Sequence, residues 1–95
     1  MTAYVVMIRD RMRDEAVFQN YAAGARDARP GHEFDILAFY GQASTLEGAE
    51  ADGIVILAFP DRNAAQSWYD SPKYKEAKEH RFASADYRVM IVDGV

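Results

Sequence analysis

The chain has 95 residues, which is enough for one small domain spanning residues 1–95. Its formal net charge of −4 and pI of about 5.0 argue against non-specific nucleic-acid binding, which needs a concentrated basic surface. The lack of cysteine excludes disulfides, thiol nucleophiles and thiolate metal sites. No apolar run approaches the ~20 residues that span a bilayer, and the N-terminus has no signal-peptide pattern. We therefore expect a cytoplasmic protein without a membrane or nucleic-acid partner.

Four segments have the length and composition of strands and carry apolar side chains on both faces. They are Ala3–Arg9, Phe34–Tyr40, Gly53–Phe59 and Tyr87–Val92. Side chains alternate across a strand, so an antiparallel sheet with one solvated face should alternate apolar and polar residues. These segments mostly do not. The pattern indicates that something outside the chain, most simply a second copy, covers the second face.

Helix signals lie between the strands. Asp14 is placed to cap a helix that runs to about Ala28, with apolar residues at helical spacing. Asp61 is placed to cap a second helix, which breaks at Ser71-Pro72. Pro72 can occupy the first position of a further helix that runs to Arg81.

The resulting order, βαββαβ, predicts an α+β fold of the ferredoxin-like kind, with a four-stranded antiparallel sheet and two main helices on one face. Leaving some 500 Å² of apolar sheet in water would cost on the order of 12 kcal/mol at ~25 cal/mol per Å². That cost is comparable to the whole stability of a domain, ~5–15 kcal/mol. The sequence therefore predicts a homodimer that forms through the sheet face.

Several local motifs occur in a characteristic order. They are Leu46-Glu47-Gly48, Phe59-Pro60, the run from Trp68 to Tyr74 (WYDSPKY), Arg81 behind it, and the ending from Ile91 to Val95. Together they resemble the bacterial family called domain of unknown function 1330 (DUF1330), within the dimeric α/β-barrel superfamily. The resemblance covers nearly the whole chain. It implies a ferredoxin-like protomer and a dimer with facing sheets, and no established reaction.

Related families in that superfamily include cofactor-independent monooxygenases, muconolactone isomerases and haem-dependent peroxidases, so the fold alone does not choose a chemistry. The chain also departs from the family pattern at three places. Gly31-His32 stands where the family often has Gly-Gly. The segment that ends at Gly53 replaces a basic Pro-x-Arg-like segment that often precedes the third strand in the family. Ala58 stands where the family often has Glu. Pocket chemistry that depends on that arginine or glutamate is not carried over.

Arg81 is the first candidate for a ligand contact. Its planar fork of donors could clamp a carboxylate or an enolate in a pocket between helix and sheet. The alternative is a structural salt bridge to one of three acids, Asp70, Glu47 or Asp86. Both roles remain open from the sequence.

Trp68, Tyr69 and Tyr74 surround the helix break at Pro72 and form a second candidate group. As a set they could form a pocket wall, with a phenol that hydrogen-bonds a ligand. Packing of an amphipathic helix against the sheet would explain the same pattern. The sequence does not separate these two interpretations.

The candidate catalytic residues are His80, Tyr69 and Glu47. His80 lies four residues after Glu76, so the pair could orient a base or form a solvated contact. Tyr69 could act as a proton donor or base. Glu47 could be an acid/base group, a surface cap or a pairing residue across a dimer. His32 is a candidate ligand contact in a turn, or a plain loop residue.

We predict no metal and no cofactor, because two isolated histidines lack metal-ligand spacing and no glycine-rich phosphate loop is present. Three functions stay open. The first is a dimer that binds a small anionic or aromatic molecule. The second is a cofactor-independent enzyme performing proton transfer or monooxygenase-like chemistry. The third is a structural or stress-related self-associating module. Whether the protein is an enzyme is left open.

Overall fold

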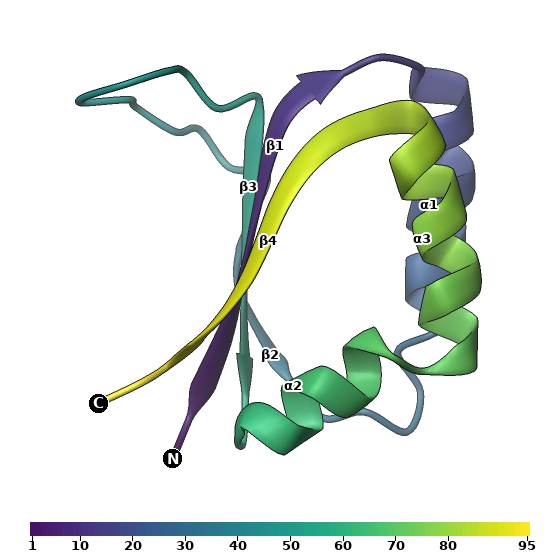
Figure 1. The fold of residues 1–95 in the computed structure, drawn as a ribbon, viewed down its shortest axis with the longest axis vertical. Helices are drawn as coiled ribbons and strands as arrows, with labels where there is room; N and C mark the ends of the chain where they lie inside the picture. The colour runs from purple at the N-terminus through teal and green to yellow at the C-terminus, as the bar shows by residue number, and fades with distance from the viewer.

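The computed structural model describes residues 1–95 and contains a single four-stranded sheet with three helices (Figure 1). The elements are β1 (Ala3–Met12), α1 (Glu15–Asp27), β2 (Asp35–Phe39), β3 (Gly53–Phe59), α2 (Arg62–Tyr69), α3 (Pro72–Ser84) and β4 (Ala85–Asp93). The strand order is β2-β3-β1-β4, and every neighbouring pair is antiparallel. This arrangement confirms the predicted α+β ferredoxin-like fold.

The strand boundaries differ from the predicted ones. β1 continues to Met12 because it goes on pairing with β4 beyond a register shift between Arg9 and Arg11. β2 ends at Phe39 because the next residue, Tyr40, has a φ of 55°, in the left-handed region that breaks a strand. β4 begins at Ala85, directly after α3.

The helix starts follow the predicted caps. The carboxylate of Asp14 accepts a hydrogen bond from the Val17 backbone N–H at 3.1 Å, and that of Asp61 accepts from the Ala64 N–H at 2.7 Å. Ser71, which the sequence marked only as a break, also caps α3 by accepting from the Tyr74 N–H at 3.3 Å. These caps fix where each helix begins, and therefore which side chains face the sheet.

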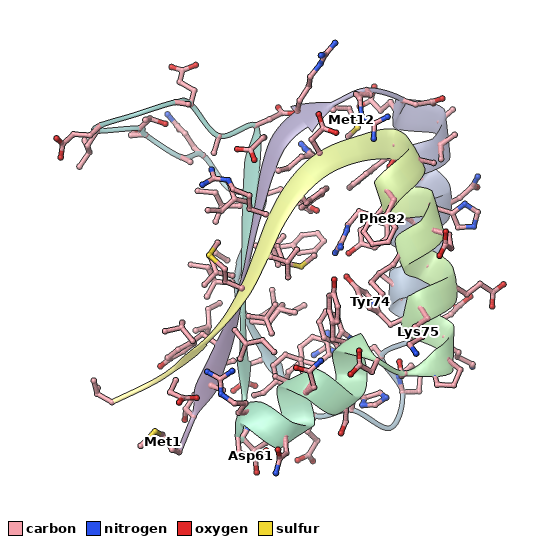
Figure 2. The ribbon with its side chains drawn as sticks, in the orientation of Figure 1. Met1, Met12, Asp61, Tyr74, Lys75 and Phe82 are labelled. Carbon is pink, nitrogen blue, oxygen red and sulfur yellow. The ribbon has the colours of Figure 1, made fainter.

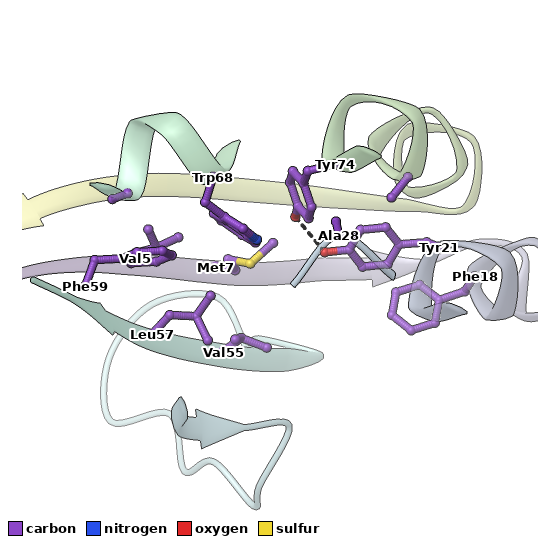
Figure 3. Packing of buried hydrophobic residues seen from close by; sticks show 12 residues of the cluster. Val5, Met7, Phe18, Tyr21, Ala28, Val55, Leu57, Phe59, Trp68 and Tyr74 are labelled. Atoms are coloured by element: carbon purple, nitrogen blue, oxygen red, sulfur yellow. Dashed lines mark hydrogen bonds between the residues drawn. The ribbon is translucent and has the colours of Figure 1, made fainter. Parts of the chain in front are cut away.

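All three helices lie on one side of the sheet (Figure 1). The core between the two layers is built from alternate strand residues and from aromatic side chains of the helices (Figure 3). The buried core residues are Val5, Met7, Phe18, Tyr21, Ala28, Val55, Leu57, Phe59, Ala65, Trp68, Tyr74 and Ala77. Much of the space next to α1 and α3 is filled by tyrosines rather than by aliphatic residues, so the core has a polar part.

The opposite side of the sheet, called the outer face below, carries no helix. Its apolar members are Tyr4, Val6, Ile8, Ile54, Ile56, Ala58, Met90 and Val92, which alternate with the core residues on the three strands β1, β3 and β4. Val6 pairs with both Ile56 and Met90, so apolar rows run across the strands. The predicted apolar residues on both faces are therefore confirmed for β1, β3 and β4.

α1 and α3 pack closely at a small-residue contact. A Cβ placed on Gly24 of α1 would lie 2.9 Å from the Cβ of Ala77 and 3.3 Å from its Cα. Neither atom can move without moving the helix backbone. The absence of a side chain at Gly24 therefore sets how closely the two helices approach.

We expect Gly24→Val to lower the free energy of unfolding by ~1–3 kcal/mol, because the added carbons overpack the contact with Ala77. Chemical denaturation measures the change. Ala23→Val on the exposed face of the same helix is the matched control, and it should show only the ~0.5 kcal/mol cost of valine in a helix. Equal effects of the two variants would contradict this account of the contact.

Candidate functional site

Arg81 is an arginine enclosed by the protein, with 2% of its surface exposed. It lies on the face of α3 that also carries Tyr74, Ala77, Lys78 and Ser84, the other buried residues of this helix. The spacings of three, four and seven residues bring these positions to one side of the helix. This side faces the sheet, so the guanidinium enters the space between the two layers.

The Arg81 guanidinium donates to two tyrosine hydroxyls, and a third tyrosine is hydrogen-bonded to one of them. Its Nη1 donates to the Tyr74 hydroxyl at 3.2 Å, and its Nη2 donates to the Tyr69 hydroxyl at 3.4 Å. The Tyr74 hydroxyl is also hydrogen-bonded to the Tyr21 hydroxyl at 2.7 Å (Figure 3). One cation is thus linked to α1, α2 and α3 through one phenol from each. We call Tyr21, Tyr69, Tyr74 and Arg81 the phenol–arginine cluster.

No carboxylate compensates the charge of Arg81. The ion pairs of the chain are Arg9–Asp52, Arg13–Asp86, Arg62–Asp93 and Arg88–Asp10. The structure therefore does not contain the alternative salt bridge that the sequence left open. Asp86 is paired with Arg13, Asp70 accepts a hydrogen bond from Gln66, and Glu47 lies in an exposed loop.

Two buried hydrogen-bond donors beside Tyr74 have no partner. They are the Nε of Arg81 and the indole Nε1 of Trp68. The Trp68 and Tyr74 rings lie with their centroids 4.2 Å apart, and the indole nitrogen of Trp68 points away from the helix toward the interior (Figure 3). A buried donor without an acceptor costs ~1–3 kcal/mol. An acceptor group placed in this region would relieve that cost.

Burial raises the pKa of Tyr74 far above its ordinary value, and the neighbouring Tyr21 raises it further while Arg81 opposes the shift. Burial also raises the pKa of Tyr21. Both phenols are therefore protonated at neutral pH. The pKa of Arg81 is lowered by burial but raised more by Tyr74, Tyr21 and Tyr69, so Arg81 keeps its charge. At neutral pH a full positive charge is met only by neutral dipoles.

Lys78 is a second buried cation that the sequence analysis missed. It is 9% exposed, and its Nζ lies 3.7 Å from the centroid of the Tyr69 ring, a cation–π contact. It forms no ion pair with an acid. Lys78 lies four residues after Tyr74 and three before Arg81, and this spacing could have indicated that all three residues share one face of the helix.

A second phenol pair continues the cluster toward β2. The hydroxyls of Tyr40 and Tyr87 are hydrogen-bonded, and the Tyr87 ring lies 5.2 Å from the Arg81 Cζ. Arg9 lies over the Tyr40 ring at 4.8 Å, but its charge is balanced by Asp52. Of the arginines in this region, only Arg81 is left without a counter-charge.

The remaining candidate residues lie elsewhere. His32 lines an open cavity of about 550 Å³ at the end of β3, together with Thr2, Arg29, Glu33, Phe34, Asp35, Ala58, Phe59 and Pro60. His80 and Glu76 line a groove of about 380 Å³ between α1 and α3, without an ion pair between them. Glu47 lies in the loop that projects from the other side of the sheet (Figure 1). The structure brings together Trp68, Tyr69, Tyr74 and Arg81, and leaves the histidines and Glu47 apart from them.

No three His, Cys, Asp or Glu side chains lie together in a way that could hold a metal ion. None of the helices is both long enough and apolar enough to cross a membrane. The chemistry available in the cluster is therefore that of cations, phenols and an indole: they can bind an anion, donate hydrogen bonds and stack on a planar group.

Comparisons with known proteins agree with this architecture. The family model described as domain of unknown function (DUF1330) matches residues 2–95. No curated protein matches the sequence. Family membership confirms the resemblance carried by the motifs around Trp68–Tyr74.

Solved structures match the fold at low sequence identity. The RPA0582 protein from Rhodopseudomonas palustris matches with a TM-score of 0.79 and 18% identity, over 99% of this chain and 81% of that one. A protein from Jannaschia sp. CCS1, described as dimeric, ferredoxin-like and of unknown function, matches with a TM-score of 0.68 and 16% identity, over 99% and 100% of the two chains. SnoaB from Streptomyces nogalater, described as a cofactor-independent oxygenase, matches with a TM-score of 0.58 and 12% identity, over 98% and 91%.

The buried phenols predict a loss of stability at high pH. A raised pKa in the folded state means that, above pH about 10, the unfolded chain releases phenol protons that the folded chain keeps. The free energy of unfolding should therefore fall as the pH rises above the ordinary tyrosine pKa and be unaffected by these groups below it. Ultraviolet absorbance should show Tyr21 and Tyr74 ionising only together with the loss of circular dichroism.

Tyr74→Phe provides the direct check, because it should reduce the amplitude of the cooperative alkaline step. Full ionisation of every tyrosine in a chain that is still folded would contradict the burial described for the cluster.

Proposed function

We propose a function from the site itself, because the chain belongs to a family, the domain of unknown function DUF1330, whose description names no activity. The protein is a homodimer, and each protomer binds a small anionic molecule, preferably an aromatic one, at the phenol–arginine cluster. The single observation that carries this proposal is the buried, positively charged Arg81 without an acidic partner.

A buried charge without a counter-charge is costly, on the order of several kcal/mol after relaxation of the surroundings. Tyr74 and Tyr69 reduce that cost as hydrogen-bond acceptors, but they do not neutralise the charge. A carboxylate, enolate or phenolate would supply the missing charge and an acceptor for the free Nε. Lys78, on the same face of α3, adds a second positive charge over the Tyr69 ring.

The walls of the cluster favour a planar ligand. Trp68, Tyr69 and Tyr74 form a continuous aromatic group, with ring centroids 4.2–6.2 Å apart. Aromatic faces stack on planar groups, and the free indole N–H of Trp68 can donate to a polar substituent. An aromatic carboxylate combines both requirements.

The ligand reaches Arg81 through a change of side-chain position, because the cluster is closed in this structure. Tyr69 and Tyr87 contact the guanidinium and are themselves partly exposed. Phe82, which follows Arg81, is 54% exposed and has its ring 5.3 Å from the Arg81 Cζ. Rotation of these rings would uncover the charge without a change in the backbone.

The uncovered outer face supports the homodimer. Met90 and Val92 of the outer face are about half exposed. Proteins from Thermobifida fusca and Jannaschia sp. CCS1 with this fold are described as dimeric. A second copy placed sheet to sheet would remove the outer face from water and add to the stability of a small domain.

A second candidate is a cofactor-independent enzyme that binds the same anion and transfers a proton. The observation in its favour is the position of Tyr69, whose hydroxyl accepts from Arg81 and whose ring contacts Lys78. A phenol between two cations could donate or accept a proton at a bound enolate. If the protein binds the anion but does not convert it to a product, only the binding function remains.

Benzoate provides a direct test of anion binding. We expect saturable binding to the wild-type protein by calorimetry, and binding at least tenfold weaker for benzamide, which has a similar shape without the charge. Arg81→Leu should abolish benzoate binding. Arg81→Lys should weaken it, because an ammonium retains the charge but lacks the planar fork of donors.

Arg62→Leu is the matched control, because Arg62 is an exposed arginine paired with Asp93 on the surface. It should leave benzoate binding unchanged. Circular dichroism confirms that each variant is folded. Equal binding by wild type and a folded Arg81→Leu variant would refute the assignment of the site, and no binding of any small carboxylate would favour the self-associating module.

A further inference from the structure

The connection between β2 and β3 is a long loop, residues 41–52, without a helix or strand of its own. Figure 1 shows it projecting from the sheet on the side away from α1 and α3. Residues 41–50 are all exposed, and the apolar side chain of Leu46 is 92% exposed. Most connections in compact domains are shorter, with a median of about 4–6 residues, so a loop of this length calls for an explanation.

The loop is held firmly at both ends. At its end, the Asp52 carboxylate accepts from the Arg9 Nε at 3.2 Å and from the Met12 N–H at 3.0 Å, and its backbone N–H donates to the Arg9 carbonyl at 2.8 Å. Before the start of the loop, the Tyr40 N–H donates to the Ile54 carbonyl at 2.9 Å, and the Tyr40 hydroxyl is hydrogen-bonded to the Tyr87 hydroxyl. Fixed ends give the projecting middle a defined direction.

The composition of the loop is that of a contact surface rather than a ligand site. It contains Glu47, Glu50 and Asp52 but no lysine, arginine or histidine. Leu46 has almost no contact with its own chain. An apolar side chain held away from the protein on a directed loop gains free energy only when another surface buries it.

We propose that residues 41–52 are an arm that reaches over a second copy of this chain and packs Leu46 against it. The inference rests on the proposed homodimer, and it adds a contact outside the sheet. The arm projects on the same side as the outer face, the surface that the second copy would cover (Figure 1). In a two-fold dimer each protomer would give one arm and receive one.

Site-specific photo-crosslinking tests the arm. Leu46 is replaced by p-benzoylphenylalanine, and ¹⁵N-labelled protein is mixed with unlabelled protein before irradiation. We expect a dimer-sized product in which the loop peptide of one isotopic form is joined to a peptide from the sheet strands of the other. The same replacement at Lys75, an exposed residue of α3, should give no product between chains.

Native mass spectrometry of the same samples separates the two claims. A dimer that gives no product between chains from position 46 would overturn the arm and leave the dimer. A monomer would overturn both the arm and the homodimer. The proposed anion site is tested separately by benzoate binding. In the dimer, Leu46→Ser should raise the dissociation constant by about tenfold or more while leaving the fold unchanged, because the lost burial occurs only against the partner. An unchanged dissociation constant would contradict the arm.

Discussion

The structure depends on one buried cation that has no acidic partner. The guanidinium of Arg81, on α3, donates hydrogen bonds to Tyr69 of α2 and Tyr74 of α3. The Tyr74 hydroxyl is hydrogen-bonded in turn to Tyr21 of α1. One charge therefore connects the three helices to each other. Burial keeps Tyr21 and Tyr74 protonated by raising the pKa of each phenol, so the charge of Arg81 stays uncompensated at neutral pH. A structural arginine is usually paired with a carboxylate, and the lack of one here distinguishes this site from ordinary packing.

The protein has two unmet requirements, one on each side of its sheet. On the helix side, a positive charge and two hydrogen-bond donors lack partners. On the other side, apolar residues of β1, β3 and β4 lack a cover, as the side chains to the left of the sheet in Figure 2 show. A small anion would meet the first requirement, and a second copy would meet the other. Because the two proposed contacts use opposite faces of the sheet, a bound anion would not obstruct the second copy.

Much of the fold could be predicted from local patterns. The βαββαβ order of the elements predicted a helix layer on one face of the sheet. Asp14 and Asp61 marked the residue before each of the first two helices. The candidate site was predicted in part. The order around Trp68–Tyr74 and Arg81 indicated one cluster. The apolar spacing in the first predicted helix could not show that the Tyr21 hydroxyl meets the Tyr74 hydroxyl, 53 residues away. The sequence also gave no sign that His32 and His80 lie in separate hollows, because their positions depend on tertiary packing.

The most direct test of the central claim is a titration of ¹⁵N-labelled protein with benzoate, followed by nuclear magnetic resonance. The chain has one tryptophan, so the indole N–H signal of Trp68 is identified without assignment, and the Arg81 Nε–H signal is identified by its loss in Arg81→Lys. Both groups lack a partner beside Tyr74. The account predicts that both signals shift saturably with benzoate and do not shift with benzamide. Two signals that stay in place across the titration of the folded protein would show that Arg81 is not an anion site.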